Sequence, residues 1–513
     1  MRSALAARAW RSTLPRSLLL TAFYAACWAV QSWPQVLSLR THSWFDDGDG
    51  LVMAWNLWLA RQQPLDIAHT DLLFHPEGAS LLLHTYVPLK GWLGALLPLD
   101  LIVTQNLLIV LSFALSGTAC YWLARRVAGN GSEAPALFAG YAFAFTGFHW
   151  AHAIGHLNLI STELLPLYAL LWLRFEDNPN WRRGLAAAGV LFAVALTDYY
   201  FALYCGVLTA VFLAARKVPW RALHRFVAPA AATTGVLAAA ALLAVGGQEL
   251  QGAHDAADYP LDPLSLIVPG GHWRFASLTE PVWSRLAGDI NEHSVNIGLG
   301  LLVLAIWKGR CRRWWAVFGV FLVLGLGEQL TVLGRTLPVP LPYALLEKVF
   351  PPLAMGGVPV RMSIMIALAA SVLGALGAKR LGRRALPLVL LLVVELWPAP
   401  RPMTRTEIPG WVEALARRSD GGAVYDAISG PKKAMYYQTI HGRPISGGAL
   451  ARMPLASLRV NVAQFDAYLA GDIVPIMEAD YEYILTNLYT IHGAQLTWTD
   501  GKLKLYRLVV ATP

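Results

Sequence analysis

The sequence predicts a polytopic α-helical membrane protein of about eleven transmembrane helices, followed by a small soluble α/β domain. Three observations support this fold class. Of the 513 residues, 56% are hydrophobic and only 14% are charged, whereas a soluble domain carries about 25% charged residues. Apolar runs of near-spanning length recur as far as Trp397. After Pro398 the pattern changes to short alternating segments that are typical of β-strands.

The apolar runs are close to the length of about 20 residues that a helix needs to cross a bilayer, although several are shorter. They lie at 17–37, 101–124, 133–148, 157–174, 184–197, 199–215, 226–246, 294–307, 314–327, 362–378 and 385–397. The two runs on either side of Asp198 fit two helices or one long kinked helix equally well.

Short basic segments separate these runs and predict their orientation. Lys and Arg favour cytoplasmic loops, and the basic clusters all fall on one side of the membrane if the N-terminus is cytoplasmic. The clusters include Arg125 and Arg126, Arg216 and Lys217, Lys308 to Arg313, and Lys379 to Arg384. The net charge of +9 therefore belongs to membrane loops, and nucleic acid is not an expected partner.

We therefore expect a multi-pass protein of the bacterial inner, or plasma, membrane. Its outward-facing segments would be 38–100, 149–156, 197–199, 247–293, 328–361 and everything after 397. Two domains are predicted: a transmembrane domain, 1–397, with a long first outer loop, 38–100, and an extracytoplasmic α/β domain, 398–513. In the second domain, KAMYYQTIHGRPISGG, YEYILTN and AQLTWTDGKLKLYRL show strand-like alternation, and Asp500-Gly501 is a predicted hairpin turn.

Polar and titratable side chains gather in the segments that are predicted to face outward. They are Asp46, Asp47, Asp49 and His84 in the first loop, His149, His152 and His156 after the third run, Asp198, then His272, Arg274 and Glu292 in the next large loop, and Arg361. Because they come from five separate loops on one side of a bundle, they predict a wet cavity that holds an anionic headgroup while its tail stays in lipid.

Each of these features also has a structural interpretation. Asp-Gly pairs are common turn formers. The spacing of His149, His152 and His156 would place them on one helical face, which suits a metal, a phosphate or simply an interfacial surface. Arg361 fits either the cavity or an anchor at the headgroups. Asp198 favours the cavity, because an acid at the membrane boundary is costly unless it is paired or wetted.

Five stretches resemble a bacterial branch of the GT-C superfamily of membrane glycosyltransferases that has a C-terminal extracytoplasmic domain. They are GDGLVMAWNLW, LLFHPEGASLLLHTYVPL, GHLNLISTELLPLY, TDYYFALY and YYQTIHGRPISGGALAR. The resemblance extends along nearly the whole chain. It implies the transfer of a sugar from a polyprenyl-phosphate donor to an acceptor glycan, lipid or protein on the extracytoplasmic face.

The resemblance also implies roles for individual residues. Asp49 would act as the general base, with Asp47 as the second choice, because an acceptor hydroxyl loses its proton as the new bond forms. Arg361 would bind the donor phosphate, with His272 and Arg274 as alternates. The resemblance leaves a metal open: Asp47-Gly48-Asp49 is a DxD motif, which holds a divalent ion such as Mg²⁺ or Mn²⁺ in some GT-C enzymes, whereas others use none.

The remaining outer residues would line the cavity and contact substrate or metal. In the tail, His441 and Arg443 of the QTIHGRPISGG segment would reach an acceptor glycan, unless that segment is a packed structural loop. Two other functions are open. A lipid or glycan transporter should have polar residues deep in its spans and broken helices in two repeats, which this sequence lacks. A non-catalytic scaffold for envelope assembly would use the tail as its binding module.

Overall fold

The computed structural model describes residues 2–82, 84–129, 131–215, 218–246, 250–252, 254–350, 353, 357–488 and 490–508. Arg216 and Lys217 of the predicted basic clusters lie outside these residues. The chain divides into two compact units. The first, here called the helical unit, contains residues 1–39, 107–237 and 253–402, and the second, the mixed unit, contains 40–106, 238–252 and 403–513.

Every predicted apolar run falls on helix. The helices are α1 (Arg2–Gln31), α4 (Leu101–Ala128), α5 (Glu133–Ala144), α6 (Gly147–His152), α7 (Leu157–Ile160), α8 (Leu164–Asp177), α9 (Trp181–Ala195), α10 (Tyr199–Ala215), α11 (Trp220–Ala230), α12 (Val236–Val245), α14 (Leu299–Lys308), α15 (Arg312–Gly325), α17 (Ser363–Leu381) and α18 (Leu386–Glu395). The runs 133–148 and 157–174 are each split between two helices, and α9 and α10 are separate helices.

Helical length limits how many of these segments can cross a bilayer unaided. Within the described part of the chain, three helical stretches are long and apolar enough to do so, namely Leu101–Ala128, Trp220–Ala244 and Pro359–Glu395. Long apolar helices of this kind are typical of a multi-pass membrane protein. The number of crossings and their orientation stay predictions.

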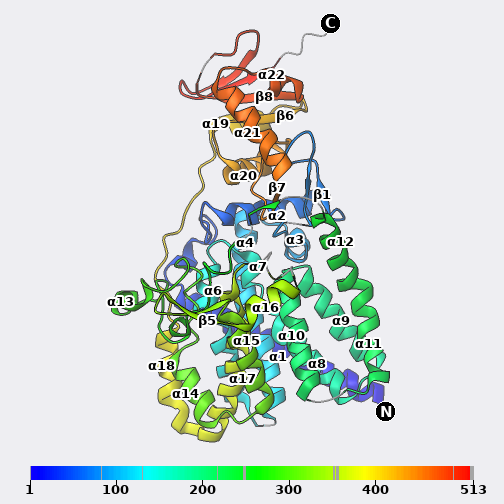
Figure 1. Ribbon diagram of the computed structural model, residues 1–513, viewed down its shortest axis with the longest axis vertical. Helices are drawn as coiled ribbons and strands as arrows, with labels where there is room; N and C mark the ends of the chain where they lie inside the picture. The colour runs from blue at the N-terminus through cyan, green and yellow to red at the C-terminus, as the bar shows by residue number, and fades with distance from the viewer. Residues whose placement is uncertain are drawn as a thin grey trace. The chain divides into compact units, whose positions relative to one another are not determined.

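Helix α17 is a long and deeply buried helix of the helical unit. Most of its side chains are buried, and it packs against α5, α14 and α15. Small residues allow this close approach: a Cβ on Gly377 would lie 2.2 Å from the carbonyl oxygen of Leu304. Figure 1 shows α14, α17 and α18 together in the yellow to green part of the chain. Small residues at such contacts are characteristic of packed membrane helices.

Shorter elements connect these helices. In the helical unit they are η1 (Gln35–Ser38), the π-helical turn η2 (Ala231–Gly235), η3 (Pro263–Leu266), η4 (Ala276–Leu278), α13 (Glu280–Trp283), the hairpin of β4 (Gln329–Val332) and β5 (Arg335–Pro340), α16 (Pro342–Val349), η6 (Pro359–Met362) and η7 (Gly382–Ala385). Several of them lie within the segments that are predicted to face outward, so those segments are folded rather than extended.

The mixed unit contains a four-stranded sheet in the order β6 (Ala423–Asp426), β8 (Tyr481–Thr486), β10 (Lys504–Arg507) and β9 (Gln495–Thr499). Strand β6 is parallel to β8, and β10 is antiparallel to both of its neighbours. The predicted β9–β10 hairpin at Asp500-Gly501 is confirmed. Gly501 has a φ of 91°, a conformation that glycine adopts at low cost.

The other elements of the mixed unit are mostly helices and two-residue strands. They are α2 (Asp49–Gln62), α3 (Pro88–Ala95), α19 (Gly410–Ala416), α20 (Pro431–His441), α21 (Leu455–Leu469), α22 (Val474–Glu478), and the paired strands β1 (His69–Thr70) with β2 (Ala79–Ser80) and β3 (Leu250–Gln251) with β7 (Met453–Pro454). The strand-like interpretation of KAMYYQTIHGRPISGG is wrong, because its first half forms α20. Pro431 begins that helix and Gly442, with a φ of 71°, ends it.

Helix α2 packs against both the first outer loop and the tail. Its residue Trp55 belongs to a buried cluster with Leu73 of the loop and Met435 of α20. Leu51, one turn before Trp55, belongs to a second buried cluster with Trp411 of the tail. The compact unit therefore combines residues 40–106 with the tail, whereas the predicted domains separate them at residue 397.

We predict that Gly140→Ala destabilises the helical unit by about 1–3 kcal/mol, the usual cost of overpacking. A Cβ there would lie 2.0 Å from the hydroxyl oxygen of Tyr24 and 2.5 Å from the carbonyl oxygen of Gly117. Thermal unfolding of the detergent-purified protein measures the change. The matched control is Gly319→Ala, since a Cβ on Gly319 meets nothing within 4 Å. Equal midpoints for the two variants would contradict this packing.

Candidate functional site

The helical unit contains a largely buried group of polar and charged side chains, here called the Arg361 cluster and defined as Arg361, Glu292, His152, Asp198 and Asn158. Arg361 donates from Nε to the two carboxylate oxygens of Glu292 at 3.0 and 3.2 Å, and from Nη2 to Oε1 as well. Glu292 is only 4% exposed. A buried ion pair of this kind is costly to desolvate and persists only when both partners are well bonded.

Local backbone structure holds Glu292 in place. Asp289 accepts hydrogen bonds at its Oδ1 from the backbone amides of Asn291 and Glu292, at 2.7 and 3.1 Å. This Asx turn fixes the chain just before Glu292. The Nε2 atom of His152, which is fully buried, lies 3.7 Å from Oε2 of Glu292. Burial lowers the pKa of His152, so the ring is neutral and adds no charge to the cluster.

Asp198 is held by two different segments. Its Oδ1 accepts from the backbone amides of Tyr200 and Phe201, at 2.8 and 3.1 Å, and so caps the N-terminus of α10. Its Oδ2 accepts from Nδ2 of Asn158 at 2.9 Å. The GHLNLIST and TDYY stretches are therefore joined by this contact. Burial raises the pKa of Asp198, whereas the positive charge of Arg361 acts to lower it.

A small pocket opens beside Arg361. Its walls include three tyrosines, Tyr200, Tyr204 and Tyr343. The Arg361 side chain is 17% accessible. The pocket thus combines a fixed cation with aromatic walls that carry hydroxyl groups, an arrangement that suits the phosphate of an anionic ligand.

The histidine series does not form one helical face. His149 and His152 lie on α6, which ends at His152, and His156 lies between α6 and α7. His149 is fully buried between Thr146 and Thr162, with its Nε2 atom 2.6 Å from the hydroxyl oxygen of Thr162. Those contacts give His149 a structural role, and only His152 joins the Arg361 cluster.

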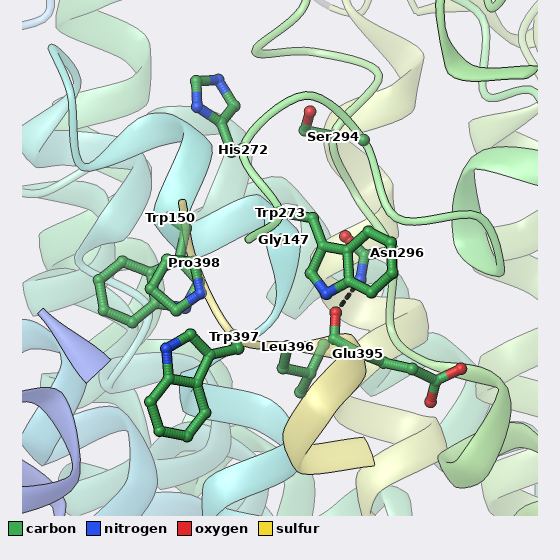
Figure 2. Close-up of a pocket in the computed structure, with 11 residues that line it drawn as sticks. Gly147, Trp150, His272, Trp273, Ser294, Asn296, Glu395, Leu396, Trp397 and Pro398 are labelled. Carbon is green, nitrogen blue, oxygen red and sulfur yellow. Dashed lines mark hydrogen bonds between the residues drawn. The ribbon is translucent and has the colours of Figure 1, made fainter. Parts of the chain in front are cut away.

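The two alternate phosphate ligands, His272 and Arg274, have different surroundings from Arg361. His272 lines a second small pocket, whose walls include Trp150, Trp273 and Trp397 (Figure 2). Its Nε2–H donates to Oδ1 of Asn291 at 2.9 Å. Burial lowers the pKa of His272, so the ring is neutral at pH 7 and supplies no positive charge. Arg274 is exposed.

The acidic motif of the first outer loop lies in the mixed unit at the start of α2. Asp46 accepts at Oδ1 from the amides of Gly48 and Gly50, both at 3.1 Å, and so orders the turn into the helix. Asp47 accepts from the hydroxyl of Thr406 at 3.1 Å. Asp49 lies 2.7 Å from the ammonium of Lys432, and each of these two side chains is 44% exposed.

His84 is buried close to this motif. Its Nε2–H donates to Oδ1 of Asn56, a residue of α2, at 3.0 Å, and its Nδ1 accepts from the amide of Ala451 at 3.3 Å. Both ring nitrogens are therefore used by the neutral form. Burial lowers the pKa of His84 to about 4, although the charge of Asp49 opposes the shift. His84 thus links the first outer loop to the tail.

The two tail residues that were predicted to contact an acceptor are used within the mixed unit. Arg443 is 5% exposed, pairs with Asp420 at 2.9 Å and lies over the ring of Tyr483. His441 accepts at Nδ1 from the amide of Arg443 at 3.1 Å. Gln438 of the same segment donates to the backbone of Leu72 and accepts from Trp55 Nε1. These contacts give the segment a structural role.

Sequence reasoning missed Lys432, Thr406 and the three tyrosines of the pocket. Tyr200 and Tyr204 stand in the TDYYFALY stretch, which did signal this position. Lys432 and Thr406 meet the acidic motif only through folding, and their local sequence carries no signal. Within the described ranges, no group of three or more His, Cys, Asp and Glu side chains is arranged to hold a metal ion.

We predict that His84 makes the protein less stable between pH 6.5 and about 4. Below pH 6.5 the unfolded chain takes up a proton on this histidine, while the folded ring stays neutral until about pH 4. The loss approaches about 3 kcal/mol at the lower limit. Thermal unfolding of wild type and His84→Gln across this range checks it. The difference between the two midpoints should change with pH, and a constant difference would contradict the assignment.

Comparison with solved structures identifies proteins of similar fold. The chain is similar to the arabinofuranosyltransferase AftD from Mycobacteria, with 16% identity and a TM-score of 0.54 over 96% of this chain and 40% of AftD. A variant of AftD gives a TM-score of 0.57 at 15% identity, over 96% and 41% of the two chains. ArnT from Cupriavidus metallidurans gives a TM-score of 0.45 at 11% identity, over 95% and 97%.

The expected resemblance to GT-C glycosyltransferases is thereby confirmed for the fold. The chain spans about 40% of the length of AftD, and identities this low establish the fold alone. A search of curated proteins found no match. A family model described as "Domain of unknown function (DUF6311)" matches residues 9–397. The chain therefore belongs to the DUF6311 family.

Proposed function

We propose that this protein is an integral membrane glycosyltransferase that moves a sugar from a polyprenyl-phosphate donor to an acceptor on the extracytoplasmic face. The observation that carries the proposal is the pocket at Arg361, where a guanidinium held by Glu292 adjoins three tyrosines. The GT-C-like fold supports the same class of reaction. Asp49 is proposed as the general base, and this assignment is argued from contacts within the mixed unit alone.

The pocket suits the phosphate of the donor for two reasons. Arginine binds phosphate through two parallel N–H donors. Arg361 lines the pocket, and Glu292 fixes its guanidinium. Tyr200 and Tyr204 line the same pocket and carry hydroxyl groups that can donate. As the bond between the anomeric carbon and the phosphate oxygen breaks, the leaving phosphate keeps the electron pair, and a fixed cation stabilises that charge.

Asp49 has the exposure that a general base needs. Its carboxylate stands in the first turn of α2, where a negative charge is favoured, and 44% of the side chain is accessible. In the proposed step the acceptor oxygen bonds to the anomeric carbon and its proton passes to Asp49. Asp47 is the second choice, because Thr406 already donates to it.

We predict that Asp49→Asn lowers transfer at least 100-fold, because an amide cannot accept the acceptor's proton. The assay measures transfer or hydrolysis from a panel of polyprenyl-phosphate sugars by the detergent-purified protein. Asp71→Asn is the matched control, since Asp71 lies in the same loop with 86% of its side chain exposed. A transporter or scaffold would turn over no donor, and normal activity of the folded Asp49→Asn variant would contradict the role of base.

We predict that removing the Arg361 cation weakens binding of undecaprenyl phosphate about 10- to 100-fold, as expected for the loss of about 1.5–3 kcal/mol of charged hydrogen bonds. Because Arg361→Gln alone leaves Glu292 buried and unpaired, the double variant Arg361→Gln with Glu292→Gln is used. Native mass spectrometry measures the affinity, and Glu292→Gln alone is the control that keeps the cation. Equal affinity of wild type and the double variant would refute the phosphate site.

A further inference from the structure

The strongest feature that the proposed function leaves unused is the ion pair of Lys432 with Asp49. Lys432 is the second residue of α20 in the tail, and its Nζ atom lies 2.7 Å from Oδ1 of Asp49. Both side chains are 44% exposed. The tail therefore supplies a cation directly to the DxD motif of the first outer loop.

Stability does not explain this pair. An ion pair with this much exposure contributes little to the free energy of unfolding, because solvent screens it and two side chains lose freedom. The N-terminus of a helix also disfavours a positive charge, yet Lys432 occupies the first turn of α20. The position of Lys432 is better explained by its ion pair with Asp49 than by any stabilisation of α20.

The residues around the motif do not fit a divalent metal ion. Mg²⁺ takes six oxygen ligands, usually one or two carboxylates together with waters and substrate phosphates, so it needs carboxylate oxygens that are not already bonded. Here the Oδ1 atoms of Asp46, Asp47 and Asp49 bind, respectively, backbone amides, the hydroxyl of Thr406 and the ammonium of Lys432. The described residues hold no group of three or more His, Cys, Asp and Glu side chains that suits a metal ion. The cation beside this motif is an ammonium.

We propose that Lys432 takes the place of the metal ion on the DxD motif, fixing the Asp49 carboxylate and balancing its charge, so that transfer needs no divalent metal. This inference rests on the proposed role of Asp49 as base. Lys432 is then a positioning residue. An ammonium has N–H donors and no acceptor, so Lys432 can hold the Asp49 carboxylate without itself taking the proton of the acceptor hydroxyl.

The test compares Lys432→Ala, Lys432→Arg and the neighbouring control Lys433→Ala in the full-length protein, with and without EDTA. We expect Lys432→Ala to lower kcat about 10- to 100-fold with little change in KM, because orientation rather than binding is lost. Lys432→Arg should retain most of the activity, Lys433→Ala all of it, and EDTA should have no effect on wild type. Full activity of Lys432→Ala, or inactivation of wild type by EDTA, would overturn the proposal.

A second measurement does not depend on turnover. Mn²⁺ is titrated into wild type and Asp49→Asn, and the free ion is counted by electron paramagnetic resonance. We expect both proteins to bind Mn²⁺ equally and weakly, since Lys432 already occupies the carboxylate. Binding by wild type that is lost in Asp49→Asn would overturn the proposal. If no donor is turned over, the proposed function fails, while this titration still decides whether Asp49 holds a metal.

Discussion

The buried fork between Arg361 and Glu292 is the interaction on which the chemistry of the helical unit depends. Taking two charges out of water costs several kcal/mol for each ion, and a hydrophobic pair of similar size often serves stability as well or better. Two further polar groups whose burial is costly lie near the pair, namely the neutral ring of His152 and the carboxylate of Asp198. The helical unit is rich in apolar helices, yet it contains this charged group. The group holds the Arg361 guanidinium in a fixed orientation beside a pocket, and a fixed guanidinium is what recognition of a phosphate requires.

The mixed unit follows a different constraint. Helix α2 directly follows the acidic motif, and it is buried in two clusters, one shared with the first outer loop and the tail and one with the tail. The polar contacts repeat this arrangement: His84 bonds to Asn56 and to the amide of Ala451, and Lys432 pairs with Asp49. The tail is therefore part of the structure that fixes the motif. A scaffold function that used the tail alone would not require those contacts.

Local patterns predicted local structure well. Apolar runs predicted where helices lie, and Asp500-Gly501 predicted the β9–β10 hairpin. The strand-like interpretation of the α20 segment failed because Tyr436 and Tyr437 are both buried in a helix that contacts more than one neighbour. Apolar residues then lie on several faces of the helix, and the sequence shows no simple helical period. Arg361 was found from its position at a helix start. Glu292 was also among the predicted residues, but its pairing with Arg361 and the pairing of Lys432 with Asp49 were not predicted, because residues distant in sequence meet only through folding.

The most direct test of the central claim is photo-crosslinking with a polyprenyl phosphate that carries a diazirine near its phosphate, followed by peptide mapping of the full-length protein. The account predicts labelling concentrated on the peptides that contain Tyr200, Tyr204, Tyr343 and Arg361, which line the pocket. Free undecaprenyl phosphate should compete, and uncharged undecaprenol should not. Labelling spread along the apolar helices, or equal competition by the alcohol, would contradict a phosphate site at Arg361.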